Sequence, residues 1–160
     1  MTIQRTFVAI KPDAVQRGLS GEILSRFEKV GLKIVAMKMK WMNPDFAKKH
    51  YAAHITKPFY PTLEKFMTEG PVIAFVLEGV NAIELVRKMC GATESASAAP
   101  GTIRGDYSHH TYKYADAKGT AIRNVVHASG NEEDAKMEIA LWFSNDEIHS
   151  YKTVHELHTM

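Results

Sequence analysis

Short apolar runs alternate with amphipathic stretches in the first quarter of the chain. Residues 6–10 (TFVAI) have the composition of a buried strand, and they lead directly into KPDAV, where Pro12 suits the first position of a helix. After Gly21, apolar residues recur at helical spacing until Gly31, and residues 32–41 alternate like a half-exposed strand. The pattern predicts a βαβ unit whose first strand runs into a helix N-terminus, a position that binds anions.

The alternation continues through the rest of the chain. The further elements that the spacing predicts are a polar helix around residues 44–53, a short helix near 61–68, a strand over 71–77, a helix over 81–90, a strand over 121–127 and a helix over 131–143. Four strands in two βαβ-like halves predict an α/β (α+β) sandwich of ferredoxin-like βαββαβ type, with an antiparallel sheet and helices on one face. The length of 160 residues fits a single domain over residues 1–160.

Residues 91–119 do not match any regular element. The segment is rich in Ala, Ser, Gly and Tyr and lacks helical or strand periodicity. It is about twice the length at which structureless loops become uncommon in compact domains, and loops that long are usually functional or disordered. The stretch TIRGD carries Arg104 among small residues, which favours an ordered binding loop. We therefore expect a long loop that belongs to the functional site.

Composition and charge exclude several classes of protein. Twenty basic and eighteen acidic side chains leave a net charge of +2, without the run of like charges that is typical of a nucleic-acid-binding arm. The longest apolar runs have the length of a core strand, and the N-terminus lacks the layout of a signal peptide, so we expect a soluble, cytoplasmic protein. Cys90 is the single cysteine, which excludes an intrachain disulfide.

Among the eight histidines, His127 has the most informative position. It ends a predicted buried strand just before a helix, where open α/β sheets present reactive groups. Ala135, Ile139 and Trp142 form an apolar stripe on that helix, and Glu138 lies within or beside the stripe. A carboxylate there needs a hydrogen-bonding partner, and a histidine ring held by a carboxylate on one nitrogen can use the other as a nucleophile.

The other histidines give a weaker signal. His50 and His54 lie four residues apart on a predicted helix, a spacing that in principle can hold a metal ion. His109 and His110 are adjacent, and three more histidines lie near the C-terminus. No further ligand spacing joins these groups, so solvated or structural roles are favoured and no metal site made by the protein is expected.

Several basic and hydroxyl side chains could converge on one polyphosphate. Lys11 stands at a predicted helix N-terminus, Arg87 near the end of the 81–90 helix, and Arg104 and Thr93 in the long loop. Taken singly, each is more often a solvated surface residue. The chain has neither a Walker A pattern nor a kinase Gly-rich loop, so phosphoryl transfer would use another scaffold.

Four segments together resemble the nucleoside diphosphate kinase family: VAIKPDAVQRG (8–18), GPVIAFVLEG (70–79), APGTIRGD (99–106), and NVVHAS with EIALWF (124–129 and 138–143). The similarity runs in order from residue 6 to residue 143. It implies transfer of the γ-phosphate of a nucleoside triphosphate to a nucleoside diphosphate by a ping-pong mechanism through a phosphohistidine. By that resemblance, His127 is phosphorylated on Nδ1 while Glu138 holds Nε2, which accounts for a carboxylate that faces inward.

The resemblance also implies the rest of the site. Lys11 acts in catalysis with the histidine and the glutamate, and the residues expected to position phosphates and ribose are Lys11, Tyr51, Arg87, Thr93, Arg104 and Asn124. Phe59 is expected to stack on the base with Leu63 nearby, and since every base has a π-face, broad base specificity follows. The cofactor is Mg²⁺ carried on the nucleotide phosphates. The expected partners are ATP, GTP, other nucleoside and deoxynucleoside di- and triphosphates, and further copies of the chain in a homo-oligomer, commonly a hexamer; neither a membrane nor a nucleic acid is expected.

Two stretches depart from the family pattern. The family usually has Gly, Ser and Asp after the histidine, whereas residues 128–130 are Ala, Ser and Gly. The alanine restricts the backbone, and the helix cap that an Asp could provide must come from Ser129 or Asn131. The link over residues 107–123 is longer than usual, which leaves open the residue that closes over the base.

Two other functional classes are compatible with a ferredoxin-like fold. An RNA recognition motif would need aromatic side chains and a leading basic residue on a central strand, whereas residues 70–79 are mostly aliphatic. A catalytically silent relative that acts as an interaction protein is disfavoured by the presence of His127 with the other expected site residues.

Overall fold

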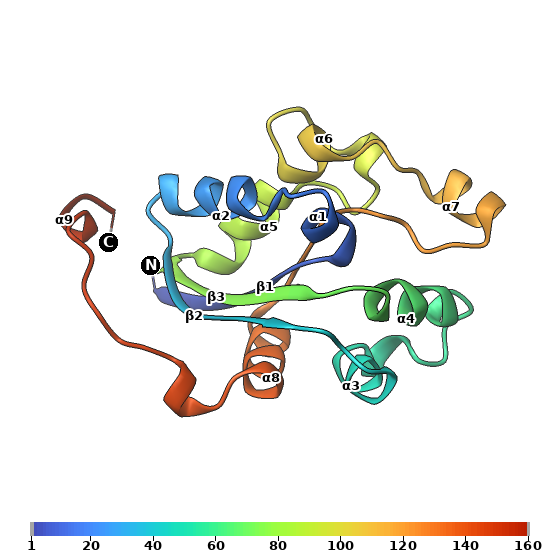
Figure 1. Ribbon diagram of the computed structural model, residues 1–160. Coiled ribbons are helices and arrows are strands. Elements are labelled where there is room, and N and C mark those ends of the chain that lie inside the picture. The colour runs from blue at the N-terminus through green and yellow to red at the C-terminus, as the bar shows by residue number, and fades with distance from the viewer. Residues whose placement is uncertain (1, 160) are drawn as a thin grey trace.

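The computed structural model describes residues 2–159 and has a four-stranded antiparallel sheet at its centre (Figure 1). The strands are β1 (Ile3–Ile10), β2 (Lys33–Lys40), β3 (Val72–Val80) and β4 (Val126–Ala128), in the order β2-β3-β1-β4. Strand β1 pairs with β3 on one side and with β4 on the other, and β2 pairs with β3 at the edge. With helices α2 (Ser20–Lys29) and α5 (Ala82–Cys90), these strands form the predicted ferredoxin-like βαββαβ arrangement.

Both faces of the sheet are covered, so the predicted restriction of helices to one face is wrong. Val8 and Ile10 of β1 pack in one cluster with residues of α2 and α5. Phe7 and Ala9 point the opposite way and pack in a second cluster with residues of α8 (Glu132–Trp142), which lies on the other side of the sheet in Figure 1. The physical reason is that β1 is apolar on both faces over residues 7–10, and such a strand needs cover on both sides.

The chain between β2 and β3 forms a small helical lobe. Helix α3 (Pro44–His50) begins at the cap Asn43, whose side chain accepts a hydrogen bond from the Phe46 N–H at 2.8 Å. The helix predicted over residues 44–53 ends at His50 and is followed by a short 3-10 turn, η1 (Ala52–His54). Helix α4 (Tyr60–Thr68) then packs against α3. This lobe places Tyr51, between α3 and η1, next to the sheet.

The segment over residues 91–119 is ordered, as predicted, but it is not devoid of helix. It contains η2 (Ser95–Ser97), α6 (Ile103–Tyr107) and α7 (Tyr112–Lys118). Helices of three to seven residues are too short to produce a recognisable hydrophobic period, which is why the sequence pattern missed them. Their starts are fixed by local caps, since the side chains of Thr102 and Thr111 accept backbone N–H bonds from Gly105 and Tyr114.

Strand β4 is shorter than the predicted strand over residues 121–127. Val125 has a φ of 59°, an uncommon conformation for a β-branched residue, and the N–H of Val126 bonds the carbonyl of Asn124 at 2.7 Å across a tight γ-turn. Because this turn interrupts the extended backbone, only residues 126–128 join the sheet. The strained turn immediately precedes His127.

The remaining elements are helix α1 (Pro12–Gln16), η3 (Asn145–Glu147) and α9 (Glu156–Thr159). Pro12 opens α1 as predicted, with Lys11 at the cap position. After α8 the C-terminal segment runs past the end of the sheet at which β2 begins (Figure 1), and there the Lys33 ammonium binds the Glu156 carboxylate at 3.0 Å. Among residues 2–159, none of the helices combines the length and the apolar character needed to cross a membrane.

Candidate active site

His127 and Glu138 are brought together by the packing of α8 on the sheet. His127 lies on β4, and its Nε2 is 2.7 Å from Oε1 of Glu138. The two side chains are 23% and 14% exposed, so the pair is sheltered without being sealed from solvent. A carboxylate only accepts, so Nε2 carries the proton and the Nδ1 lone pair is free for nucleophilic attack. The sequence-predicted pair is therefore adjacent in the structure.

Ser129 holds the second oxygen of Glu138 and was not predicted to do so. Its hydroxyl donates to Glu138 Oε2 at 2.6 Å, and Ser129 Oγ itself accepts the backbone N–H of Phe7 at 3.2 Å. Ser129 follows His127 by two positions, so both side chains leave the strand on one face. This spacing of two residues was the sequence signal that Ser129, like His127, could hydrogen-bond Glu138. The helix cap is Asn131, whose side chain accepts from the Asp134 N–H.

The alanine that follows His127 causes no backbone strain. Within the described residues, the non-glycine positions with positive φ are Asn81 and Val125, so Ala128 has a conformation open to any residue. It pairs with Val8 in the β1–β4 ladder. The departure from the family's glycine is thus accommodated by an ordinary strand conformation.

Lys11, Asn124 and Thr93 form a polar chain beside the γ-turn. Lys11 Nζ donates to Asn124 Oδ1 at 2.6 Å, and Asn124 Nδ2 donates to the Thr93 carbonyl at 2.8 Å. Both Lys11 and Asn124 are buried. Burial, followed by the positive charge of Arg104, lowers the pKa of Lys11 from 10.5 to about 8. A lysine that is short of counter-charge in this way is a ready partner for an anion.

Arg104 ties the long segment to the strand that carries His127. Its guanidinium donates to the carbonyls of Gly91 at 2.9 Å, Val126 at 2.7 Å and Asn124 at 3.3 Å. Burial lowers the pKa of Arg104. A guanidinium has five N–H donors, so these contacts leave donors for a further acceptor. Gly105 is required next to it, because a Cβ there would lie 2.1 Å from the carbonyl oxygen of Ala99.

Arg87 lies apart from this group. It is exposed on α5 and lines a separate hollow together with Gly130 and Glu132, at the start of α8. Its charge nevertheless acts on Arg104, whose pKa it helps to lower. The structure thus places Arg87 beside the start of α8 and outside the pocket that contains Lys11 and Asn124.

A pocket of about 610 Å³ adjoins the polar chain and contains most of the predicted binding residues. The predicted residues that line it are Lys11, Tyr51, Phe59, Leu63, Thr93 and Asn124. Phe59 is 51% exposed, which leaves its ring available for stacking. The wall facing α4 comes from α7 and the residues after it, including Ala115, Ala121 and Ile122. The extended link therefore supplies one side of the pocket.

One cluster of side chains among the described residues has the spacing of a metal site. It consists of His50, His127 and Glu138, which offer ligand atoms within 4.8 Å of one another, and it does not include His54. In the large pocket, Asp116 is the only carboxylate among the described lining residues. Mg²⁺ takes oxygen ligands in octahedral geometry and is commonly bound through one or two carboxylates plus phosphates, so the pocket suits an ion that arrives on the nucleotide.

Comparisons with known proteins identify the family. The family model for nucleoside diphosphate kinase matches residues 4–148. The nucleoside diphosphate kinase of Borreliella burgdorferi is 51% identical over 157 residues, which cover 95% of this chain and 94% of that protein. The nucleoside diphosphate kinase of Pyrococcus furiosus is 54% identical over 149 residues, covering 93% of this chain and 88% of that protein.

Two solved structures are similar over nearly their whole length. A transition state mimic of nucleoside-diphosphate kinase from Borrelia burgdorferi with bound vanadate and ADP has a TM-score of 0.94 at 49% identity, covering 98% of this chain and 96% of that chain. A halophilic nucleoside diphosphate kinase from Halobacterium salinarum in complex with CDP has a TM-score of 0.85 at 41% identity, covering 98% and 97%.

The fold and the family match are those of a phosphotransferase that acts on nucleotides. The chain belongs to the nucleoside diphosphate kinase family. Membership of this family excludes the alternative that the chain is an RNA recognition motif.

Proposed function

We propose that the protein transfers the γ-phosphate of a nucleoside triphosphate to a nucleoside diphosphate in two half-reactions through phosphorylated His127. In the first, the Nδ1 lone pair attacks the γ-phosphorus, the bond to the β–γ bridging oxygen breaks, and the nucleoside diphosphate leaves. In the second, a terminal β-phosphate oxygen of another nucleoside diphosphate attacks the phosphohistidine and His127 is released. No net proton or electron is needed.

The observation that carries this proposal is the chain of hydrogen bonds that runs from Ser129 through Glu138 to His127. Each oxygen of Glu138 has one donor, at 2.6 and 2.7 Å, so the carboxylate is fixed and in turn fixes the imidazole. Phosphorylation of Nδ1 gives the ring cationic character, and an adjacent carboxylate stabilises that charge. Glu138 therefore orients the nucleophile and lowers the barrier to its phosphorylation.

The pocket beside the polar chain is the proposed nucleotide site. Lys11, Arg104 and Arg87 supply positive charge for the phosphates, with Tyr51 and Thr93 as hydroxyl donors and Asn124 and Lys11 facing the ribose. Mg²⁺ carried on the nucleotide would neutralise part of the phosphate charge. The base stacks on Phe59 next to Leu63, against the wall that includes Ala121 and Ile122. Stacking does not distinguish bases, so ATP, GTP and the other nucleoside and deoxynucleoside substrates are all accepted.

We also propose that the chain works as a homo-oligomer in the cytoplasm, as a hexamer by analogy with relatives. The support on this chain is the edge strand β2, where Met37 and Met39 are 53% and 61% exposed and are followed by Trp41 at 64%. Large apolar side chains along an unpaired strand edge are typical of a surface that another subunit covers. Sedimentation or light scattering measures the subunit number directly.

The experiment that tests the function is phosphoenzyme trapping. Mg-ATP without an acceptor is expected to add one phosphate per chain, stable to alkali and labile to acid, and GDP is expected to discharge it as GTP. His127→Ala is expected to abolish both labelling and turnover. Ser108→Ala serves as a matched control, because Ser108 bonds the Arg123 carbonyl away from the nucleophile. Labelling that survives in His127→Ala would exclude His127 as the carrier.

A further inference from the structure

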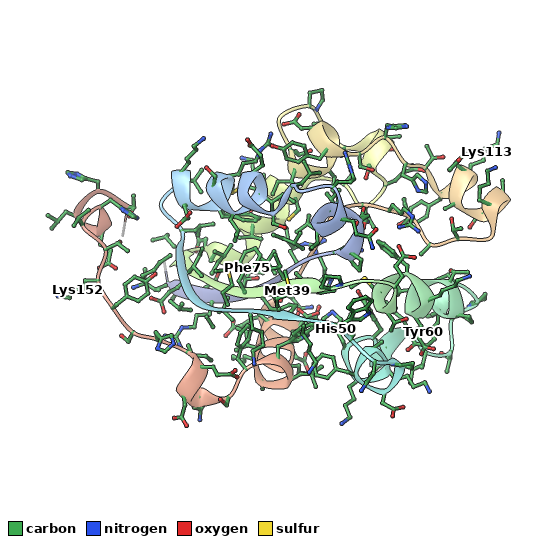
Figure 2. All side chains as sticks on the ribbon, viewed as in Figure 1. Met39, His50, Tyr60, Phe75, Lys113 and Lys152 are labelled. Atoms are coloured by element: carbon green, nitrogen blue, oxygen red, sulfur yellow. The ribbon has the colours of Figure 1, made fainter. Side chains whose placement is uncertain are left out.

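The ring of His50 lies against the imidazole of His127, and nothing in the proposed function uses it. His50 is the last residue of α3 and lies beside α8 under the sheet (Figure 2). The two rings have centroids 5.0 Å apart and an interplanar angle of 78°. Phe7 and Tyr51 also contact one or both rings, with centroids 6.0 and 6.4 Å from that of His127. The imidazole of His127 is thus backed by an aromatic wall whose nearest member is His50.

The indole of Trp142 determines where the proton of His50 resides. Trp142 Nε1 lies 3.1 Å from His50 Nδ1, and an indole N–H can only donate. Nδ1 of His50 is therefore an acceptor, and in a neutral ring the proton is on Nε2. Nε2 is buried and has no hydrogen-bond partner among the described residues. His50 is held as one tautomer by a neighbour on α8, the helix that also carries Glu138.

The surroundings of His50 keep it uncharged. Burial lowers its pKa well below 6.5, and the charges of His127, Lys11 and His54 lower it further. Glu138 and the Tyr51 hydroxyl are the other titratable groups close to it. A cationic His50 would carry its added proton on Nδ1, against the Trp142 N–H, and its charge would compete with His127 for the Glu138 carboxylate. With His50 neutral, the hydrogen bonds of Glu138 go to His127 and Ser129.

The alternative use of this cluster is a transition-metal site, and the hydrogen bonds disfavour it. Imidazole binds a metal through an unprotonated nitrogen. On His50, Nδ1 already accepts the Trp142 N–H and Nε2 carries the proton. On His127, Nε2 is paired with Glu138 at 2.7 Å. A metal ion would have to displace the Trp142 hydrogen bond or the Nε2 proton of His50, and His127 could bind it only through Nδ1, the proposed nucleophile.

We infer that His50 is a positioning residue for the phosphoryl-transfer step, acting as a neutral wall that fixes the orientation of the His127 imidazole. The inference rests on the proposed function of His127. One hydrogen bond to Glu138 leaves the ring free to tilt about that bond, whereas a ring packed edge-to-face against it removes this freedom. Displacing a reacting atom by about 1 Å costs roughly a hundredfold in rate, so a loose ring has a measurable effect.

Two substitutions of His50 distinguish the effect of its ring packing against His127 from the effect of its hydrogen bond with Trp142. His50→Phe keeps a flat neutral ring beside His127 but removes the acceptor for the Trp142 N–H. His50→Asn keeps an acceptor near the position of Nδ1 but removes the outer part of the ring. The measured quantities are the single-turnover rate of phosphorylation by Mg-ATP, followed by intact mass, and the affinity for ADP. His50 does not line the nucleotide pocket, so its loss should change the rate and not the affinity.

For His50→Asn we expect a phosphorylation rate lower by about tenfold or more, with ADP affinity within about twofold of the unmodified protein. For His50→Phe we expect a rate within about threefold. Equal losses in the two variants, or an unchanged rate in His50→Asn, would overturn the inference. Phe46→Leu is the control for stability, because Phe46 packs edge-on against Trp142 at 4.8 Å on the same core. It should lower the melting temperature and leave the rate unchanged.

A spectroscopic measurement tests the same idea without a substitution. Two-bond ¹H–¹⁵N correlation spectra identify histidine tautomers, and we expect His50 to keep its proton on Nε2 from about pH 6 to pH 8, the range in which an ordinary histidine titrates. A His50 that titrates in this range contradicts the neutral wall. Phosphorylation of the unmodified protein by Mg-ATP is measured in parallel. That measurement tests the proposed function independently of the role of His50.

Discussion

Replacing Lys11 by methionine should make the nucleotide-free protein more stable while removing its activity. Lys11 is buried and its pKa is lowered from 10.5 to about 8, so the folded state disfavours the charged ammonium. At about 1.4 kcal/mol per factor of ten in proton affinity, this corresponds to a cost of about 3 kcal/mol. Methionine has a similar length and no charge, but it leaves Asn124 Oδ1 without its donor, which costs about 1 kcal/mol. The net gain is about 2 kcal/mol.

The pH dependence of this gain has a definite sign. Below about pH 8, Lys11 is protonated in both the folded and the unfolded state, and the full cost is present. Between about pH 8 and 10.5, the folded state releases its proton first, so the cost fades as pH rises. The difference in free energy of unfolding between Lys11→Met and the unmodified protein should therefore be largest near neutral pH. It should become smaller as the pH approaches 10.5.

Scanning calorimetry at a fixed protein concentration measures this difference. A gain of about 2 kcal/mol raises the melting temperature of a domain this size by roughly 4–8 °C. Concentration must be constant, because assembly also contributes to the apparent stability. Phosphorylation by Mg-ATP is expected to fall by at least about a hundredfold in the same variant. A variant that melts lower than the unmodified protein at pH 7, or a gap that stays constant with pH, would refute the argument that Lys11 is destabilised by burial.

Three further outcomes are expected. Glu138→Gln should keep labelling but at a rate lower by roughly tenfold to a thousandfold, since the amide oxygen accepts the ring N–H without stabilising its charge; a rate equal to the unmodified one argues against that role. A 2′,3′-dideoxy analogue should be a poor substrate, because Lys11 and Asn124 lose their partner, and a kcat/KM equal to that of ADP contradicts this. Deleting residues 109–118 should weaken assembly while leaving the chain folded, since Tyr112 and Tyr114 are exposed at 47% and 53%; an unchanged oligomer mass argues against a subunit contact.

The strands and the main helices were predictable because each carries its signal locally. Strands β1, β2 and β3 and helices α2, α5 and α8 lie within a few residues of their predicted bounds. Their apolar positions repeat with a period set by the backbone geometry alone. The short helices within residues 91–119 could not be predicted in this way. They are held by single caps and by Arg104, and such contacts leave no periodic pattern in the sequence.

The sequence by itself also predicted that His127 and Glu138 lie together, as they do in the structure. His127 stands at the end of a strand, and Glu138 interrupts the apolar stripe of α8, so a buried carboxylate and a histidine required each other on energetic grounds. The order of motifs along the chain added the class of reaction. These inferences use only local spacing and the cost of burying a charge.

Only the tertiary structure decided which residues support that pair. Ser129 meets Glu138 because α8 packs on the face of β4 that both side chains share, and His50 reaches His127 from a helix 77 positions earlier in the chain. The tautomer of His50 depends on Trp142, 92 residues away. Contacts between such distant segments arise from how helices pack on the two faces of the sheet. Local propensity carries no information about that packing.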